Sequence, residues 1–405
     1  MRTSKPFLSR AGLWLTFGSA AAILFSIAVS QILLALALAA LFLSGERLRL
    51  PRIKWPLFLF LLGTVISLAF SGEPTAGLPQ IRKFYVFCEL LVVFSCLRDI
   101  AVIRWLYLTW AGFASIDALR GLVQFAGKLR EAHQLGRNVY DYYVAERITG
   151  FTSHWNTFSA EQMFALIMLA SFLFFGPRNR KRVWIWICCA ALIAVAVLLA
   201  ETRGVWIATA IAALYLVWYW NRKLVLLVPA AILVAFLVSP PAIRERFQSL
   251  VQPRQSDSNA FRIITWRTGI RMIAAHPWLG LGPEGPHYHF DEWVPPDTPR
   301  PLPAGWYGHL HNIYLQYAAE RGIPTMLVMM WLLGQIIFDF AAGLHKLPPG
   351  RSNSRFLLHG GIAVVLAILT EGFVEYNLGD SEVLTMFLVV VGCGYLAMEK
   401  DLAVE

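Results

Sequence analysis

Residues 183–221 read VWIWICCAALIAVAVLLAETRGVWIATAIAALYLVWYWN, so that two apolar runs flank the polar turn Glu201-Thr202-Arg203-Gly204. Each run approaches the ~20 apolar residues that cross a bilayer as an α-helix. A segment inside hydrocarbon must satisfy its own backbone hydrogen bonds, and a helix does so. The stretch therefore predicts two membrane-spanning helices joined by a short turn at one membrane face.

The rest of the chain repeats this pattern. The 405 residues are 57% hydrophobic and only 15% charged, which suits lipid as the solvent better than water. We place twelve spans, at residues 11–27, 29–44, 55–72, 79–97, 102–125, 156–176, 183–200, 203–220, 223–240, 323–345, 356–375 and 381–398. The predicted fold is an all-α polytopic membrane protein with about twelve transmembrane helices, and residues 1–405 form a single membrane domain.

The positions of Lys and Arg set the orientation. A net charge of +10 would suggest nucleic acid for a soluble protein, but these cations gather in alternate short loops, and we predict no nucleic-acid partner. The clusters are Arg2/Lys5/Arg10, Arg47/Arg49/Arg52/Lys54, Arg98/Arg104, Arg178/Arg180/Lys181/Arg182, Arg222/Lys223 and Lys346/Arg351/Arg355. The positive-inside rule places these loops and both termini in the cytoplasm.

Two long segments, 128–155 and 241–322, fall on the opposite face, which is periplasmic or extracellular in this orientation. Seven of the nine histidines lie in them. The second segment separates the ninth and tenth predicted spans and is too long and aromatic for a plain connector. We therefore expect the chemistry in this large outer loop, which should contain short helices.

A helix is predicted at residues 260–275 of the outer loop. On a helical wheel Arg262 shares a face with Trp266, Ile270 and Ile273, whereas Arg267 lies on the solvated side. A guanidinium on a buried face needs an anion there, which makes Arg262 the preferred functional cation. The alternative is an arginine that snorkels at the membrane interface.

Two further loop patterns carry weaker signals. Residues 280–285 formally match GxGxxG, but no strand precedes them, so a tight turn is favoured over a dinucleotide site. His287 and His289, near Asp291 and Glu292, are residue types that can bind zinc, but their spacing is weak and ordinary loop polarity is the favoured explanation.

His311 and Arg203 complete the candidate site. A helix is predicted to begin near His311 and to end at Gly322, and a helix N-terminus keeps a histidine neutral and available as a base. A capping or packing role is the alternative for His311. Arg203 lies between two apolar helices, either as an interfacial turn residue or as part of an anion pocket.

Several charges fall within or near the predicted spans, and they keep a transporter hypothesis open because intramembrane charges often line ion pathways. They are Glu89, Asp117, Arg120, Glu371 and Glu375. Asp117 and Arg120 are three positions apart on one helix and are expected to neutralise each other.

The outer-loop motifs together resemble the O-antigen ligase/polymerase superfamily. They are Thr202-Arg203-Gly204-x-Trp206, Asn259-x-x-Arg262-x-x-x-Trp266, His276-Pro277-x-x-Gly280-x-Gly282, His311-Asn312-x-Tyr314-Leu315-Gln316 and Glu320-x-Gly322-Ile323-Pro324. The resemblance implies a polytopic glycosyltransferase of the GT-C type in the inner membrane of a Gram-negative bacterium. Its donor would be a glycan on undecaprenyl pyrophosphate, and its transfer step would be periplasmic.

The length and short tail are more similar to the ligase, whose acceptor is a sugar hydroxyl of lipid A–core oligosaccharide. The alternatives are the related polymerase and, from another class, a transporter or flippase for an anionic lipid or small anion. A transporter would use the same arginines to bind without chemistry.

The resemblance also implies roles for individual residues. Arg203 and Arg262 would hold the pyrophosphate leaving group, and His311 would take the proton of the acceptor hydroxyl. His309 would bind substrate and is the reserve base, and Arg267 would also bind substrate. Arg82 and Lys83 are reserve phosphate ligands. Direct attack would invert the anomeric centre, without metal or cofactor.

Overall fold

The computed structural model describes residues 4–177, 182–239, 244–245, 248, 259–303, 305–348, 350 and 352–399. Within these ranges the regular structure is helical and no strand occurs. The N-terminal half contains α1 (Ser4–Ala22), α2 (Ile27–Ser44), α3 (Lys54–Ala69), α4 (Leu78–Arg82), α5 (Phe84–Cys96), α6 (Ile100–Gln134), α7 (Val139–Ala145), α8 (Trp155–Phe175) and α9 (Val183–Leu199). The C-terminal half contains α10 (Arg203–Asn221), η1 (Arg222–Leu226), α11 (Leu227–Val238), α13 (Asn259–Ala275), α14 (Gly285–Tyr288), α15 (Phe290–Trp293), α16 (Ile313–Lys346), α17 (Ser352–Glu371), η2 (Asn377–Gly379) and α18 (Ser381–Leu396).

The helices show a membrane protein. Five meet the length and apolarity of a membrane span: Ile27–Ser44, Trp155–Phe175, Arg203–Val238, Ile313–Lys346 and Ser352–Glu371. Three shorter apolar helices are Lys54–Ala69, Val183–Leu199 and Ser381–Leu396. The number of twelve spans and the GT-C type therefore stay predictions.

Several predicted spans differ from the observed helices. The span predicted at 79–97 is broken at Lys83 into α4 and α5, and the one at 223–240 opens with the 3-10 turn η1. Helix α6 runs to Gln134, well past the predicted end at 125, because its last turns carry polar residues that hydropathy excludes but a helix accepts in water. The helix α6 therefore continues beyond the point where its apolar residues end.

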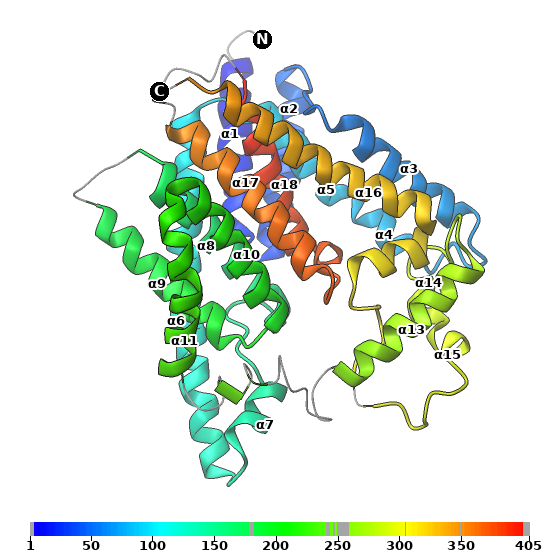
Figure 1. Cartoon of the computed structure of the whole chain (residues 1–405). Helices are drawn as coiled ribbons and strands as arrows, with labels where there is room; N and C mark the ends of the chain where they lie inside the picture. The colour runs from blue at the N-terminus through cyan, green and yellow to red at the C-terminus, as the bar shows by residue number, and fades with distance from the viewer. Residues whose placement is uncertain are drawn as a thin grey trace.

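The bundle packs around α8, α17 and α18, whose side chains are mostly buried. Helix α17 contacts both α8 and α10, α18 contacts α5, and α16 contacts α3. In Figure 1 the start of α1 and the end of α18 lie together at one end of the bundle, and α7, α13 and α15 lie at the other end. The outer-loop helices therefore gather at the end of the bundle away from the start of α1.

Helix α13 packs against the loop before α16 through a face that only partly matches the one that the helical wheel indicates. Its buried residues are Ile264, Thr265, Thr268 and Met272, whereas Ile270 is 57% exposed. The helix is oriented by contacts with the loop: the Thr265 hydroxyl donates to the Leu310 carbonyl at 3.3 Å. The prediction that Ile270 faces the protein was wrong, because hydrophobicity alone does not record which face a neighbouring loop covers.

The His276-Pro277 turn docks on a kink in α16. Gly322 has φ +80 and interrupts α16. The first part of α16 therefore ends at Gly322, as predicted, and the second part of the helix follows directly. Ile323 N donates to Pro277 O at 2.8 Å, and Gly282 N donates to Glu320 O at 2.9 Å. An added Cβ at Gly322 would lie 2.0 Å from the Trp278 carbonyl oxygen, so only glycine permits this approach.

Candidate active site

One cavity of about 750 Å³ collects residues from segments far apart in the sequence. Its cations and histidines are Lys83, Arg147, His154, Arg203, Arg262, His309 and His311. Acidic side chains line it as well, among them Glu320, Glu371, Glu375 and Asp380. A concave site with this many ionisable groups is the expected place for binding an anion or for proton transfer.

The cavity brings together most of the residues singled out from the sequence. Arg203, Arg262, His309 and His311 all line it, as does Lys83, whose Nζ donates to Gly379 O at 2.7 Å. Arg267 does not: its guanidinium donates to both carboxylate oxygens of Asp297, at 2.8 and 2.7 Å. The structure thus places Arg267 in an exposed ion pair outside the cavity.

Arg203 begins α10 and is 7% exposed. The preceding turn is held against α8, because the hydroxyls of Thr202 and Ser159 lie 2.8 Å apart. Glu201 has φ +50, a conformation that costs a non-glycine residue about 1–2 kcal/mol. Strain of this kind tends to persist where the surroundings hold a functional side chain in place.

Arg262 lies in the first turn of α13 and reaches the loop between α17 and α18. Its Nη2 is 3.5 Å from Oε2 of Glu375, and its side chain is 19% exposed. The sequence predicted that a guanidinium on this face needs a nearby anion. The Glu375 carboxylate is such an anion and partly balances the charge of Arg262. Unlike Arg267 on the same helix, Arg262 therefore combines burial with access to the cavity.

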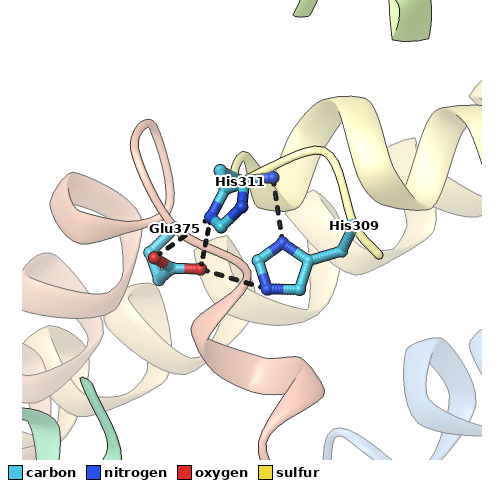
Figure 2. Close-up of side chains that lie close together, drawn as sticks. All are labelled: His309, His311 and Glu375. Atoms are coloured by element: carbon cyan, nitrogen blue, oxygen red, sulfur yellow. Dashed lines mark hydrogen bonds and ion pairs between the residues drawn. The ribbon is translucent and has the colours of Figure 1, made fainter. Parts of the chain in front are cut away.

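Glu375 is the centre of the arrangement in Figure 2, where it points from the loop after α17 toward His309 and His311. Its Oε1 is 3.2 Å from His311 Nδ1 and 3.4 Å from His309 Nε2. Its Oε2 accepts a hydrogen bond from Asn156 Nδ2 at 2.9 Å. One buried carboxylate therefore contacts two histidines, an arginine and an asparagine from three other parts of the chain.

The charges around Glu375 keep it ionised. Burial acts to raise the pKa of Glu375, but the hydrogen bond from His311 and the electrostatic interactions with His311, His309 and Arg262 outweigh burial and hold the pKa well below its usual range. Burial lowers the pKa of His309 to about 3. His309 is therefore neutral at physiological pH beside a charged Glu375.

The backbone of His311 is also special. His311 has φ +47 and directly precedes Asn312, whose side chain accepts a hydrogen bond from Leu315 N and caps α16. Its Nδ1 faces Glu375, and its Nε2 lies 3.0 Å from the Trp306 carbonyl oxygen. Both ring nitrogens thus face acceptors, and a neutral ring can donate to only one of them.

His309 is less suited to act as a base. Its Nδ1 accepts a hydrogen bond from the backbone N–H of His311 at 3.1 Å. That contact places the ring proton of the neutral form on Nε2, which faces Glu375. His309 then has no basic nitrogen directed at the cavity and instead supports the backbone of His311.

A buried polar network connects the loop that carries His309 and His311 to the neighbouring helices. Gln316 accepts a hydrogen bond from Leu310 N at 2.7 Å and donates to Glu320 at 2.8 Å. Glu320 in turn forms a buried ion pair with Arg321, whose Nε donates to Thr64 at 3.0 Å. The Gln316 and Glu320 motif positions therefore connect the histidine loop to α3.

The same three groups also form a donor set. His309, His311 and Glu375 each offer one ligand atom, and these atoms lie within 4.8 Å of one another. Two imidazoles and a carboxylate are ligands that zinc and iron accept. However, the Arg262 guanidinium already contacts the carboxylate, and a cation at that distance opposes a divalent ion. The predicted pair His287 and His289 is not part of this set, and His289 instead contacts Glu292 at 3.0 Å.

Sequence reasoning missed the role of Glu375, which was grouped with intramembrane charges and a transport pathway. It also missed Arg147, which comes from the first outer segment, and Asn156, which follows that segment in the first turn of α8. The concentration of histidines in both outer segments, His154 included, was the signal that the two would meet. Nothing in the sequence pairs Glu375 with His311.

One family model matches the part of the chain that contains several of the cavity residues. Residues 188–330 match the family model described as O-antigen ligase, and this stretch contains Arg203, Arg262, His309 and His311. No curated protein matches the chain. The match over residues 188–330 supports membership of the O-antigen ligase family.

Proposed function

We propose that this protein is an O-antigen ligase. It transfers O-antigen polysaccharide from undecaprenyl pyrophosphate to a sugar hydroxyl of lipid A–core oligosaccharide, on the periplasmic face of the Gram-negative inner membrane. One observation carries the proposal: Arg203, Arg262 and His311, the anion-binding and basic residues of the family motifs, line a single cavity. That cavity lies in a helical membrane protein of this family, at the level where α8, α10 and α16 begin.

The cations of the cavity suit the leaving group. Lipid pyrophosphate gains negative charge as the glycosidic bond breaks, so charge-assisted bonds from Arg203 and Arg262 strengthen in the transition state. Lys83 and Arg147 line the same cavity and add positive charge. An arginine that moves from Glu375 toward the pyrophosphate gains a doubly charged partner.

The transfer can be written as one balanced step in which His311 is the base. The acceptor oxygen attacks the anomeric carbon, the bond from that carbon to the pyrophosphate oxygen breaks, and the electron pair leaves with the lipid pyrophosphate. The hydroxyl proton passes to Nε2 of His311. Glu375, bonded to Nδ1, orients the ring and stabilises the imidazolium that forms. Attack opposite the leaving group inverts the anomeric centre.

A host deletion tests the proposal. Lipopolysaccharide from the deletion strain is run on a silver-stained gel beside an assay of lipid-linked glycan. The expected result is loss of every band that carries O-antigen, with polymerised lipid-linked glycan accumulating, and rescue by wild type but not by Arg203→Ala, Arg262→Ala or His311→Ala.

Other outcomes separate the alternatives. Core that carries a single repeat would identify a polymerase. An unchanged ladder would reject both and leave transfer of the glycan to a protein or transport of an anionic lipid or small anion. Normal rescue by Arg262→Ala or Arg203→Ala protein that is present at wild-type level would reject the mechanism even where the ligase assignment holds.

A further inference from the structure

A second cavity adjoins the candidate active site. It has a volume of about 530 Å³ and lies between the short helices α14 and α15 and residues 300–302 and 306–308. Trp306 and Gly308 line both cavities. A volume of this size lies within the ~300–1,000 Å³ typical of small-ligand sites. The two hollows are therefore neighbours that share one wall.

The lining of this second cavity combines aromatic rings with hydrogen-bonding groups. Phe290, Trp306 and Tyr307 supply rings, and the Trp306 side chain is 58% exposed. Arg300 and Asp291 supply a guanidinium and a carboxylate that lie 3.2 Å apart and are largely exposed. Aromatic faces cover the apolar C–H surfaces of a ligand, and charged planar groups bind its hydroxyls.

Trp306, which lines both cavities, lies next to His311, the proposed base. Nε2 of His311, the nitrogen proposed to take the proton, faces the Trp306 carbonyl at 3.0 Å. Its other nitrogen faces Glu375 inside the large cavity. A hydroxyl that reaches Nε2 must therefore take the place of the Trp306 carbonyl. Trp306 lines the second cavity as well as the large one.

We propose that this second cavity is the subsite for the saccharide of the acceptor. The inference rests on the proposed transferase function and names where its acceptor binds. The sugar lies against Trp306 and Tyr307, Arg300 and Asp291 bind its hydroxyls, and the attacking hydroxyl enters past Trp306 to His311. The pyrophosphate of the donor occupies the large cavity, so the two substrates approach the anomeric carbon from opposite sides, as inversion requires.

Charge distinguishes the subsite from the donor site. Among the described residues lining it, Arg300 is the one Lys or Arg, and it is paired with Asp291, whereas Lys83, Arg147, Arg203 and Arg262 line the large cavity. Pyrophosphate therefore favours the large cavity. An acyl chain would remove water from the Arg300–Asp291 pair and from His287 without offering hydrogen bonds in return, which disfavours it in the second cavity.

The structure offers a matched pair of variants for the test. Arg300–Asp291 and Arg267–Asp297 are both exposed ion pairs of the outer loop, and of the two only the first lines the second cavity. Purified Arg300→Ala and Arg267→Ala proteins are compared with wild type. Transfer is measured with lipid-linked O-antigen as donor and core lipopolysaccharide from the deletion strain as acceptor. Binding of the delipidated core oligosaccharide is measured separately by calorimetry.

Arg300→Ala is expected to raise KM for the acceptor at least about tenfold and to weaken oligosaccharide binding by a similar factor, the effect of ~1.4 kcal/mol. Its kcat and its KM for the donor should stay at wild-type values, and Arg267→Ala should match wild type throughout. An unchanged acceptor KM, or an equal rise in donor KM, would overturn the subsite. Failure of wild-type protein to transfer at all, with His311→Ala indistinguishable from it, would instead reject the proposed function.

Discussion

Oε1 of Glu375 lies 3.2 Å from Nδ1 of His311, although 64 positions separate the two residues. The contact is made because the start of α16 is fastened to the loop after α17: Ile313 N donates to Gly372 O at 2.8 Å, and Asn312 Nδ2 donates to Phe373 O at 3.0 Å. The carboxylate then meets the histidine, and Arg262 approaches its second oxygen. The proposed base therefore depends on two helix ends that pack together.

Replacing Glu375 by glutamine should reduce transfer by ~10²–10⁴-fold, because a neutral amide no longer stabilises the imidazolium. The matched control is Glu292→Gln, which removes the carboxylate that contacts His289 outside the large cavity. The control should transfer within about twofold of wild type. Initial rates in detergent or liposomes check this, and a near-normal rate for Glu375→Gln would remove Glu375 from the mechanism.

Arg262→Ala should lower kcat by ~10²–10³-fold, because the developing charge on the pyrophosphate loses a donor. Arg262→Lys should recover only part of the loss, since an ammonium cannot bind two oxygens side by side. Arg267→Ala, on the same helix, is expected to behave as wild type because its partner is Asp297. Equal losses at the two positions would indicate that the helix, not the cavity, is affected.

Acid should destabilise the fold in a defined window. The pKa of His309 falls from 6.5 to about 3 on folding, so the unfolded chain binds a proton that the folded chain does not. The free energy of unfolding therefore has its full value above pH 6.5. It declines as the pH falls below that value, with a slope of up to ~1.4 kcal/mol per pH unit. The lowered pKa of Glu375 adds a further loss below its unfolded value of 4.5.

Unfolding in detergent between pH 7 and pH 5 measures this effect. Wild-type stability should fall across the interval, and His309→Asn should show a shallower dependence because it lacks the titrating ring. Parallel curves for the two proteins would show that His309 is not the group responsible.

Gly322→Ala should disrupt the outer loop. The new Cβ would lie 2.0 Å from the Trp278 carbonyl oxygen, and φ +80 would cost alanine about 1–2 kcal/mol before any displacement. Gly334→Ala is the control, because nothing lies within 4 Å of its added Cβ and the position is helical. We expect a lower thermal midpoint and less folded protein for Gly322→Ala, and wild-type behaviour or better for Gly334→Ala.

Chelation should not affect transfer. Arg262 occupies one side of Glu375, so the charge that a divalent ion would supply is already present. Rates after dialysis against excess EDTA should equal untreated rates, and added zinc should inhibit by competing for His309, His311 and Glu375. Loss of activity in EDTA that zinc or magnesium restores would contradict the metal-independent mechanism.

The sequence alone was enough to predict the helical membrane architecture and most helix boundaries, because hydrocarbon leaves a spanning chain few alternatives to a helix. It also indicated Arg203, Arg262 and His311, since polar residues interrupting apolar or aromatic stretches require a physical reason. Those signals are local, and each can be recognised within one helix or turn.

Only the tertiary structure decided which of these residues meet. It paired Glu375 with His311, placed Arg267 outside the cavity with Asp297, and turned Ile270 to the surface. It also formed the second cavity beside Trp306. Periodicity records that a face is apolar but not which segment covers it, and contacts between helix ends depend on the packing of the whole bundle.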